Sequence, residues 1–136
     1  MNPADLATLF GLRALPDGLA RVEATLDRAV EVERAEIEGP ARRVVLGGGK
    51  RLRPALSLAC AAAAGGRGDE AVVDADVVDG ATAVELVQAG SLVHDDIMDG
   101  AGERRGVPTI NAVEGANQAI LVGDFILARA ASWPPG

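Results

Sequence analysis

Apolar side chains recur at three- and four-residue intervals after Pro16, a spacing that places them on one face of a helix: Leu19, Val22, Leu26 and Val30. The charged residues of the same segment fall mostly on the other side. Pro16 suits a first helical turn, where its missing N–H costs no hydrogen bond. The pattern predicts an amphipathic helix over residues 16–33.

Glycine and proline divide the rest of the chain into further helical segments: 3–12, 36–46, 55–64, 70–99 with interruptions at Gly80 and Gly90, and 108–132. The glycines at 47–49 end one segment, whereas Pro54 and Pro108 begin two others. Residues 100–107 are expected to form a polar loop. The sequence therefore predicts an all-α chain, an antiparallel bundle of five or six helices.

Composition supports helices and limits the partners. The chain has 136 residues, enough for one domain and too few for two, so residues 1–136 are treated as a single unit. A formal net charge of −7 and a pI near 4.6 argue against nucleic-acid binding, which needs a basic face. Only Phe10, Phe125 and Trp133 are aromatic, which favours packed helices over a β-sandwich.

The sequence carries no sign of export or of a membrane segment. Cys60 is the single cysteine, so no intrachain disulfide is expected, which suits a reducing compartment. Its Ala-rich surroundings are typical of a small core residue. No charge-free apolar stretch reaches the roughly 20 residues that span a bilayer, and no basic n-region precedes an apolar segment. We expect a cytoplasmic protein without a membrane span.

Three acidic residues, Asp95, Asp96 and Asp99, interrupt an apolar stretch that reads as helix. Asp95 and Asp99 are four residues apart and therefore lie on one helix face. Like charges at that spacing destabilise an isolated helix by about 0.2–0.5 kcal/mol, so a cation between them would be favourable. Magnesium suits such oxygen ligands and shares its other positions with water and phosphate. A solvated acidic surface is the alternative interpretation.

Cationic residues flank this acidic cluster in sequence. Lys50 and Arg53 follow the glycines at 47–49, and Arg104 and Arg105 follow the aspartates. Glycine lets the backbone approach a phosphate, while lysine and arginine together suit a diphosphate. The glycines also serve as a helix C-cap, and both roles are compatible. The spacing is not that of a P-loop.

Small and polar residues precede the aspartates on the same predicted helix. Gln88 lies seven residues before Asp95, almost two turns, and so shares its face, either as a solvated amide or as a donor to phosphate. Gly90 and Ser91 either leave open space beside the helix or mark close helix packing. A lone histidine such as His94 is more typical of a hydrogen-bonded structural residue than of a ligand.

These blocks resemble the N-terminal half of the polyprenyl synthetase (trans-isoprenyl diphosphate synthase) family over about residues 16–131. The matching segments, in order, are Gly48–Pro54, Glu85–Gln88, Asp95–Asp99, Arg104–Gly106 with Pro108–Thr109, and Leu121–Phe125. Class I terpene cyclases share the aspartate motif but lack the Gly-Gly-Lys-Arg-x-Arg-Pro and Arg-Arg-Gly blocks. The resemblance implies the first five or six helices of an isoprenoid synthase fold, with the C-terminal half of the domain absent.

The resemblance also implies roles for individual residues. Asp95 and Asp99 would hold Mg²⁺ on an allylic diphosphate, with Asp96 in support, and Arg104 would contact the same diphosphate. Isopentenyl diphosphate would be held by the remaining polar residues of the motifs: Lys50, Arg53, Gln88 and Arg105. The implied reaction is loss of diphosphate from the allylic substrate, attack of isopentenyl diphosphate on the allylic cation and loss of a proton.

Product length is expected to depend on Gly90 and Ser91. In many family members a bulky side chain five residues before the first aspartate limits the product. Five residues span about 7.5 Å along a helix, so glycine there predicts a product longer than farnesyl.

The resemblance leaves the biological unit open. Members are usually more than twice as long, and a second aspartate-rich motif lies in the half absent here, so we expect little or no turnover by this chain alone. Three interpretations remain: an incomplete prenyltransferase, one piece of a split or heteromeric enzyme, or a noncatalytic helical interaction module that uses segment 108–132. A homodimer or a partner that supplies the C-terminal half is expected.

Overall fold

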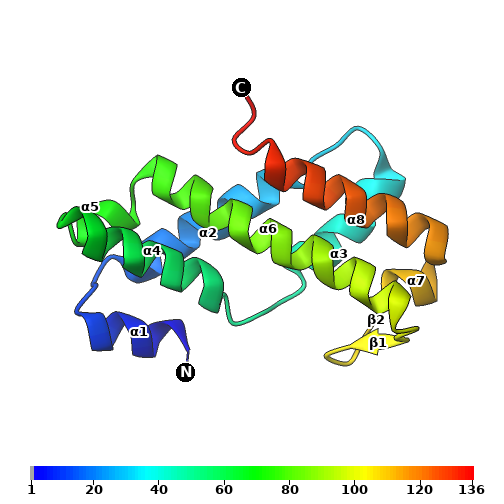
Figure 1. Cartoon of the computed structure of the whole chain (residues 1–136), viewed down its shortest axis with the longest axis horizontal. Coiled ribbons are helices and arrows are strands. Elements are labelled where there is room, and N and C mark those ends of the chain that lie inside the picture. The colour runs from blue at the N-terminus through cyan, green and yellow to red at the C-terminus, as the bar shows by residue number, and fades with distance from the viewer. Residues whose placement is uncertain (1) are drawn as a thin grey trace.

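Helices make up nearly all of the regular structure in residues 2–136, the part described by the computed structural model (Figure 1). They are α1 (Pro3–Phe10), α2 (Leu15–Ala29), α3 (Ala35–Leu46), α4 (Leu52–Gly65), α5 (Asp69–Val72), α6 (Ala75–Met98), α7 (Ile110–Val113) and α8 (Ala116–Ala131). Helices α5 and α7 are single turns of four residues each. The prediction of an all-α bundle is confirmed, with six helices of eight residues or more.

Helix α6 is the central element of the bundle. It lies alongside α8 and also contacts α2, α3 and α4 (Figure 1). Its buried side chains include Leu86 and Val93, and α8 contributes Val122 and Ile126 to the same core. The candidate functional residues on α6 therefore lie on the helix that contacts the most other helices.

The predicted segment 70–99 is two helices, and the break is not at a glycine. Helix α5 ends at Val72, and Asp74 begins α6 as its N-cap, with its carboxylate accepting hydrogen bonds from the Asp76 and Val77 amides at 3.0 and 3.3 Å. Such a cap satisfies amides that the first turn leaves unpaired. The expected interruptions at Gly80 and Gly90 are wrong, because α6 runs through both.

The predicted loop 100–107 and helix 108–132 also differ from the structure. A short antiparallel hairpin joins β1 (Glu103–Arg104) to β2 (Val107–Pro108). Thr109 then caps the single turn α7, with its hydroxyl accepting from the Ala112 amide. Gly115, at a φ of 91°, separates α7 from α8.

The Cys60 side chain is exposed on α4, so its expected place in the core is wrong. No helix among residues 2–136 is long and apolar enough to cross a membrane.

Candidate functional site

A cavity of about 770 Å³ lies between the α3–α4 loop, α6 and the hairpin. All five residues predicted to bind substrate line it: Lys50, Arg53, Gln88, Arg104 and Arg105. Apolar side chains such as Leu92 and Ile110 line the same space. Three separate segments of the sequence thus meet at one cavity: 43–53, 85–96 and 104–111. Of the three aspartates, only Asp96 reaches its wall.

The α3–α4 loop brings backbone to this cavity without side chains. Gly48 and Gly49 have φ values of 117° and 143°, which residues with a Cβ rarely adopt. A Cβ on Gly49 would lie 3.2 Å from Nη1 of Arg105. The glycine therefore allows the guanidinium of the hairpin to approach the loop. The predicted helix end at this glycine run is confirmed, since α3 stops at Leu46.

The hairpin presents the second pair of arginines. Arg104 pairs with Val107 across the strands, and the connecting residues Arg105 and Gly106 have φ values of 53° and 77°. Two consecutive positive φ values are the mark of the type I′ turn, which suits the twist of two paired strands. Glycine favours this geometry and arginine does not. The turn fixes Arg105 at the edge of the cavity.

Ion pairs divide the six cations of the cavity wall into two groups. Arg43 is paired with Glu114, Arg51 with Glu23 and Glu85, and Arg104 with Asp96. The other three make no ion pair with any residue in the range 2–136: Lys50, Arg53 and Arg105. The wall therefore keeps three uncompensated positive charges, the charge pattern expected of an anion site.

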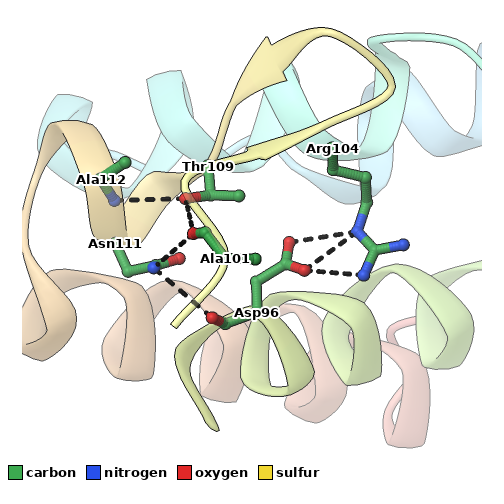
Figure 2. Close-up of polar contacts among 6 residues, drawn as sticks. All are labelled: Asp96, Ala101, Arg104, Thr109, Asn111 and Ala112. Atoms are coloured by element: carbon green, nitrogen blue, oxygen red, sulfur yellow. Dashed lines mark hydrogen bonds and ion pairs between the residues drawn. The ribbon is translucent and has the colours of Figure 1, made fainter. Parts of the chain in front are cut away.

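Asp96 is 6% exposed and binds Arg104 through both carboxylate oxygens (Figure 2). Nη2 of Arg104 donates to Oδ1 at 2.6 Å, and Nε lies 3.1 Å from each oxygen. The pKa of Arg104 is raised above its ordinary value, first by this hydrogen bond and further by the charges of Asp96, Asp95 and Asp99, against an opposing effect of burial. Arg104 thus lies in the field of all three aspartates.

Asp95 and Asp99 lie one turn apart at the exposed end of α6. Neither lines the cavity, and Asp96 is held by Arg104 instead of joining them. Across residues 2–136, no group of three His, Cys, Asp or Glu side chains is arranged to hold a metal ion. The three aspartates therefore form no shared cluster of metal ligands within residues 2–136. Two exposed carboxylates still match the ligand set of Mg²⁺, which takes one or two of them and completes its shell with water and phosphate.

Residues that sequence reasoning missed hold the aspartate end of α6 in place (Figure 2). Nδ2 of Asn111 donates to the carbonyls of Ala101 and Asp96 at 3.0 and 3.5 Å, and the Thr109 hydroxyl donates to Ala101 at 2.8 Å. Thr109 carried a usable signal, because threonine directly before a helix is a common N-cap. The hydrogen bonds of Asn111 had no signal in the sequence.

The space expected beside Gly90 is filled. A Cβ on Gly90 would lie 2.7 Å from Cγ of Leu127 on α8, and Gly90 does not line the cavity. Close helix packing is thus the interpretation that holds at this glycine, and Ser91 beside it is half-buried. Nearby, Nε2 of His94 lies 3.3 Å from the Ile120 carbonyl and 3.2 Å from Oδ1 of Asp124, as a structural histidine would.

The matching family model and the relatives described below indicate the same family. The family model described as polyprenyl synthetase matches residues 34–133. An all-trans-nonaprenyl-diphosphate synthase of Rhodobacter capsulatus is 34% identical over 119 residues, which are 88% of this chain and 35% of the relative. Heptaprenyl diphosphate synthase component 2 of Geobacillus stearothermophilus is 41% identical, over 85% of this chain and 34% of the relative.

Solved structures agree with these relatives. A decaprenyl diphosphate synthase from Rhodobacter capsulatus matches with a TM-score of 0.80 at 33% identity, covering 96% of this chain and 37% of that one. A polyprenyl synthase from Caulobacter crescentus, solved with calcium and isoprenyl diphosphate, matches with a TM-score of 0.80 at 32% identity over the same shares, 96% and 37%. This chain therefore spans about a third of the length of the proteins that it matches.

Proposed function

The chain belongs to the polyprenyl synthetase family, and we propose that it forms the isopentenyl-diphosphate-binding part of an enzyme that elongates allylic diphosphates. The observation that carries this proposal is the set of unpaired cations on one cavity wall: Lys50, Arg53 and Arg105. Lysine offers a mobile point charge and arginine a planar fork, which together suit the oxygens of a diphosphate. Gln88 adds an amide donor to the same wall.

The aspartate end of α6 would serve the allylic diphosphate. Asp95 and Asp99 would hold Mg²⁺, with Asp96 behind them and Arg104 adding positive charge. When bound, the metal would stabilise negative charge on the departing diphosphate. Leu92 and Ile110 would keep water from the reacting carbons, because they form part of the apolar lining.

We also propose that Gly90 and Ser91 influence product length, now through the position of Leu127. A product longer than farnesyl would require that Leu127 leave room beyond Gly90. Gly90→Phe would displace Leu127 and is expected to shorten the product of an active enzyme that contains this segment. Unchanged product length in an active variant would rule this out.

A heteromeric enzyme is a second candidate. One relative is named as component 2 of a heptaprenyl diphosphate synthase, and this chain spans 34% of its length. In that arrangement another polypeptide would supply the remaining helices. A noncatalytic module that uses residues 108–132 for association is the third.

Binding measurements separate these candidates. We expect the purified chain to bind isopentenyl diphosphate and inorganic pyrophosphate in calorimetry. Lys50→Ala and Arg53→Ala should each weaken binding about 10- to 100-fold, because a charge-assisted hydrogen bond contributes about 1.5–3 kcal/mol. The matched control is Arg13→Ala, an exposed arginine outside the cavity. No binding by the native chain, or an equal loss in the control, would contradict the proposal.

The magnesium role has its own test. Asp95→Asn with Asp99→Asn should abolish any increase in pyrophosphate affinity caused by Mg²⁺ and leave metal-free binding unchanged. A noncatalytic module would show neither the metal-dependent nor the metal-free component.

A further inference from the structure

Arg51 and Arg105 are the two non-glycine residues with positive φ within residues 2–136, and both line the cavity. The type I′ turn accounts for Arg105. Arg51 lies directly before α4 with φ 51° and ψ 34°. It is not part of a type I′ turn, so the turn does not explain its left-handed backbone. A left-handed backbone at a residue with a Cβ is costly and persists where the surroundings hold it.

The surroundings of Arg51 hold it from three helices. Nη1 donates to Oε1 of Glu85 on α6 at 2.9 Å, and Nη2 donates to the Val45 carbonyl near the end of α3 at 2.7 Å. Nε and Nη2 also donate to the carboxylate of Glu23 on α2. The Arg51 side chain is 11% exposed and that of Glu85 13%. Every nitrogen of the guanidinium is thus engaged within the protein.

These contacts hold Arg51 in its charged form and use most of its hydrogen-bond donors. Burial alone would lower its pKa, but the hydrogen bonds and charges of Glu23 and Glu85 outweigh burial and hold the pKa above its ordinary value. Its contact with Val45 also satisfies one of the carbonyls that the end of α3 leaves unpaired. Four of the five guanidinium N–H groups of Arg51 are therefore engaged within the protein, and one N–H on Nη1 remains for a ligand in the cavity that Arg51 lines.

In the sequence, Arg51 lies between Lys50 and Arg53, the two unpaired cations around the start of α4. Lys50 precedes it directly and Arg53 follows two residues later. We propose that Arg51 is a positioning residue, which through Glu23, Glu85 and the Val45 carbonyl fixes Lys50 and Arg53 at the separation that a diphosphate requires. This inference rests on the proposed function, since it concerns the same anion site.

Pyrophosphate binding, followed by phosphorus NMR titration, tests this role. Arg51→Lys keeps the positive charge but loses the planar fork that holds three helices together. We expect about tenfold weaker binding. The control is Arg43→Lys, another arginine of the cavity wall, which is paired with Glu114 at 2.8 Å and should stay within about twofold of the native chain. Circular dichroism and thermal melting establish that each variant is folded.

A double-mutant cycle distinguishes positioning from direct contact. If Arg51 acts through its neighbours, Arg51→Lys should change binding less than about twofold in a Lys50→Ala, Arg53→Ala background. A tenfold loss that persists in that background would overturn the inference in favour of direct contact. Native affinity in Arg51→Lys, or an equal loss in Arg43→Lys, would also overturn it.

A second variant decides the matter if Arg51→Lys does not fold. Glu85→Gln keeps the size of the side chain and the oxygen that accepts from Arg51, but it removes the negative charge. This variant should weaken pyrophosphate binding about threefold, again only when Lys50 and Arg53 are present. Native affinity in Glu85→Gln would then overturn the inference. Absence of pyrophosphate binding by the native chain would instead refute the proposed anion site, and the role of Arg51 with it.

Discussion

Arg104 and Arg105 are neighbours in sequence, but only Arg104 forms an ion pair within residues 2–136. The Arg104 guanidinium is bound to Asp96, whereas Arg105 has no carboxylate partner within residues 2–136. Sequence reasoning placed both beside a diphosphate and gave no sign of this difference. Pairing depends on which carboxylate lies within about 3 Å in the folded chain, and residue order does not specify that.

Arg105 combines backbone strain with an unpaired charge, so stability and binding should change in opposite directions when it is replaced. Asparagine suits the first central position of a type I′ turn. Arg105→Asn is therefore expected to stabilise the fold by up to about 1 kcal/mol, because a left-handed conformation is costly for arginine. The same substitution should weaken pyrophosphate binding about tenfold or more by removing a charged donor.

Urea unfolding and calorimetry on the same Arg105→Asn preparation measure both effects. Lys50→Ala is the control, since it removes a cavity cation without touching the turn and should weaken binding without raising stability. A stabilised Arg105→Asn that binds pyrophosphate as tightly as the native chain would show that Arg105 does not contact the anion.

At the scale of elements, the sequence predicted which segments are helical, but it did not predict several of the helix boundaries. Periodic apolar residues and Pro16 predicted the helix that is now α2, because they are local signals of burial and capping. Gly80 and Gly90 did not break α6, since a helix pressed against several neighbours tolerates the cost of glycine. The hairpin was missed because Arg-Gly is an uncommon type I′ pair.

Gly80 and Gly90 lie on the same helix and should respond to alanine in opposite directions. A Cβ on Gly80 would meet nothing within 4 Å, so Gly80→Ala should stabilise the fold by about 0.5–1 kcal/mol through helix propensity. A Cβ on Gly90 would lie 2.7 Å from Cγ of Leu127, so Gly90→Ala should destabilise by about 1–3 kcal/mol through overpacking. Chemical denaturation of the two variants tests the α6–α8 contact, and a stabilising Gly90→Ala would contradict it.

Asp74 gives the start of α6 a dependence on pH. Its pKa is lowered by the hydrogen bond from Arg67, at 3.2 Å, and by the amides of Val77 and Asp76. A lowered pKa means that the carboxylate form stabilises the folded chain, fully above the ordinary value of 3.8, and that this contribution is lost as the pH falls through the lowered pKa.

Asp74→Asn keeps the cap but removes the charge that pairs with Arg67. We expect its melting temperature to be a few degrees below native at neutral pH, with the gap closing as the pH falls below 3.8. Glu70→Gln is the control, since Glu70 is exposed and its side chain makes no hydrogen bond within residues 2–136, and its melting temperature should follow the native one. A gap for Asp74→Asn that is the same at every pH would exclude the charge as its origin.

At the scale of the molecule, only the resemblance to a family indicated that three distant segments meet at one cavity. Spacing within a helix places Gln88 and Asp95 on one face, but it does not say that residues 47–53 and the hairpin lie near that helix. That arrangement depends on how α3, α4 and α6 pack, which apolar periodicity leaves undetermined. The exposure of Asp95 and Asp99 outside the cavity was not foreseen for the same reason.

The separation of these aspartates from the cavity leads to a prediction about the isolated chain. Isopentenyl diphosphate would bind at the unpaired cations, but an allylic cation formed beside exposed Asp95 and Asp99 would meet water instead of the isopentenyl double bond. We therefore expect the chain alone to bind isopentenyl diphosphate and to form no elongated product with an allylic diphosphate and Mg²⁺. Radiolabel transfer, with a longer family member as the active control, measures this.

The same assay distinguishes incompleteness from loss of function. Adding the remaining two thirds of a relative as a separate polypeptide should restore transfer if the cavity in this chain is competent, and Lys50→Ala should abolish the restored activity. Elongation by the chain alone would show that residues 2–136 already close the site. Failure of every such partner, despite intact pyrophosphate binding, would place the role of this chain in binding rather than in transfer.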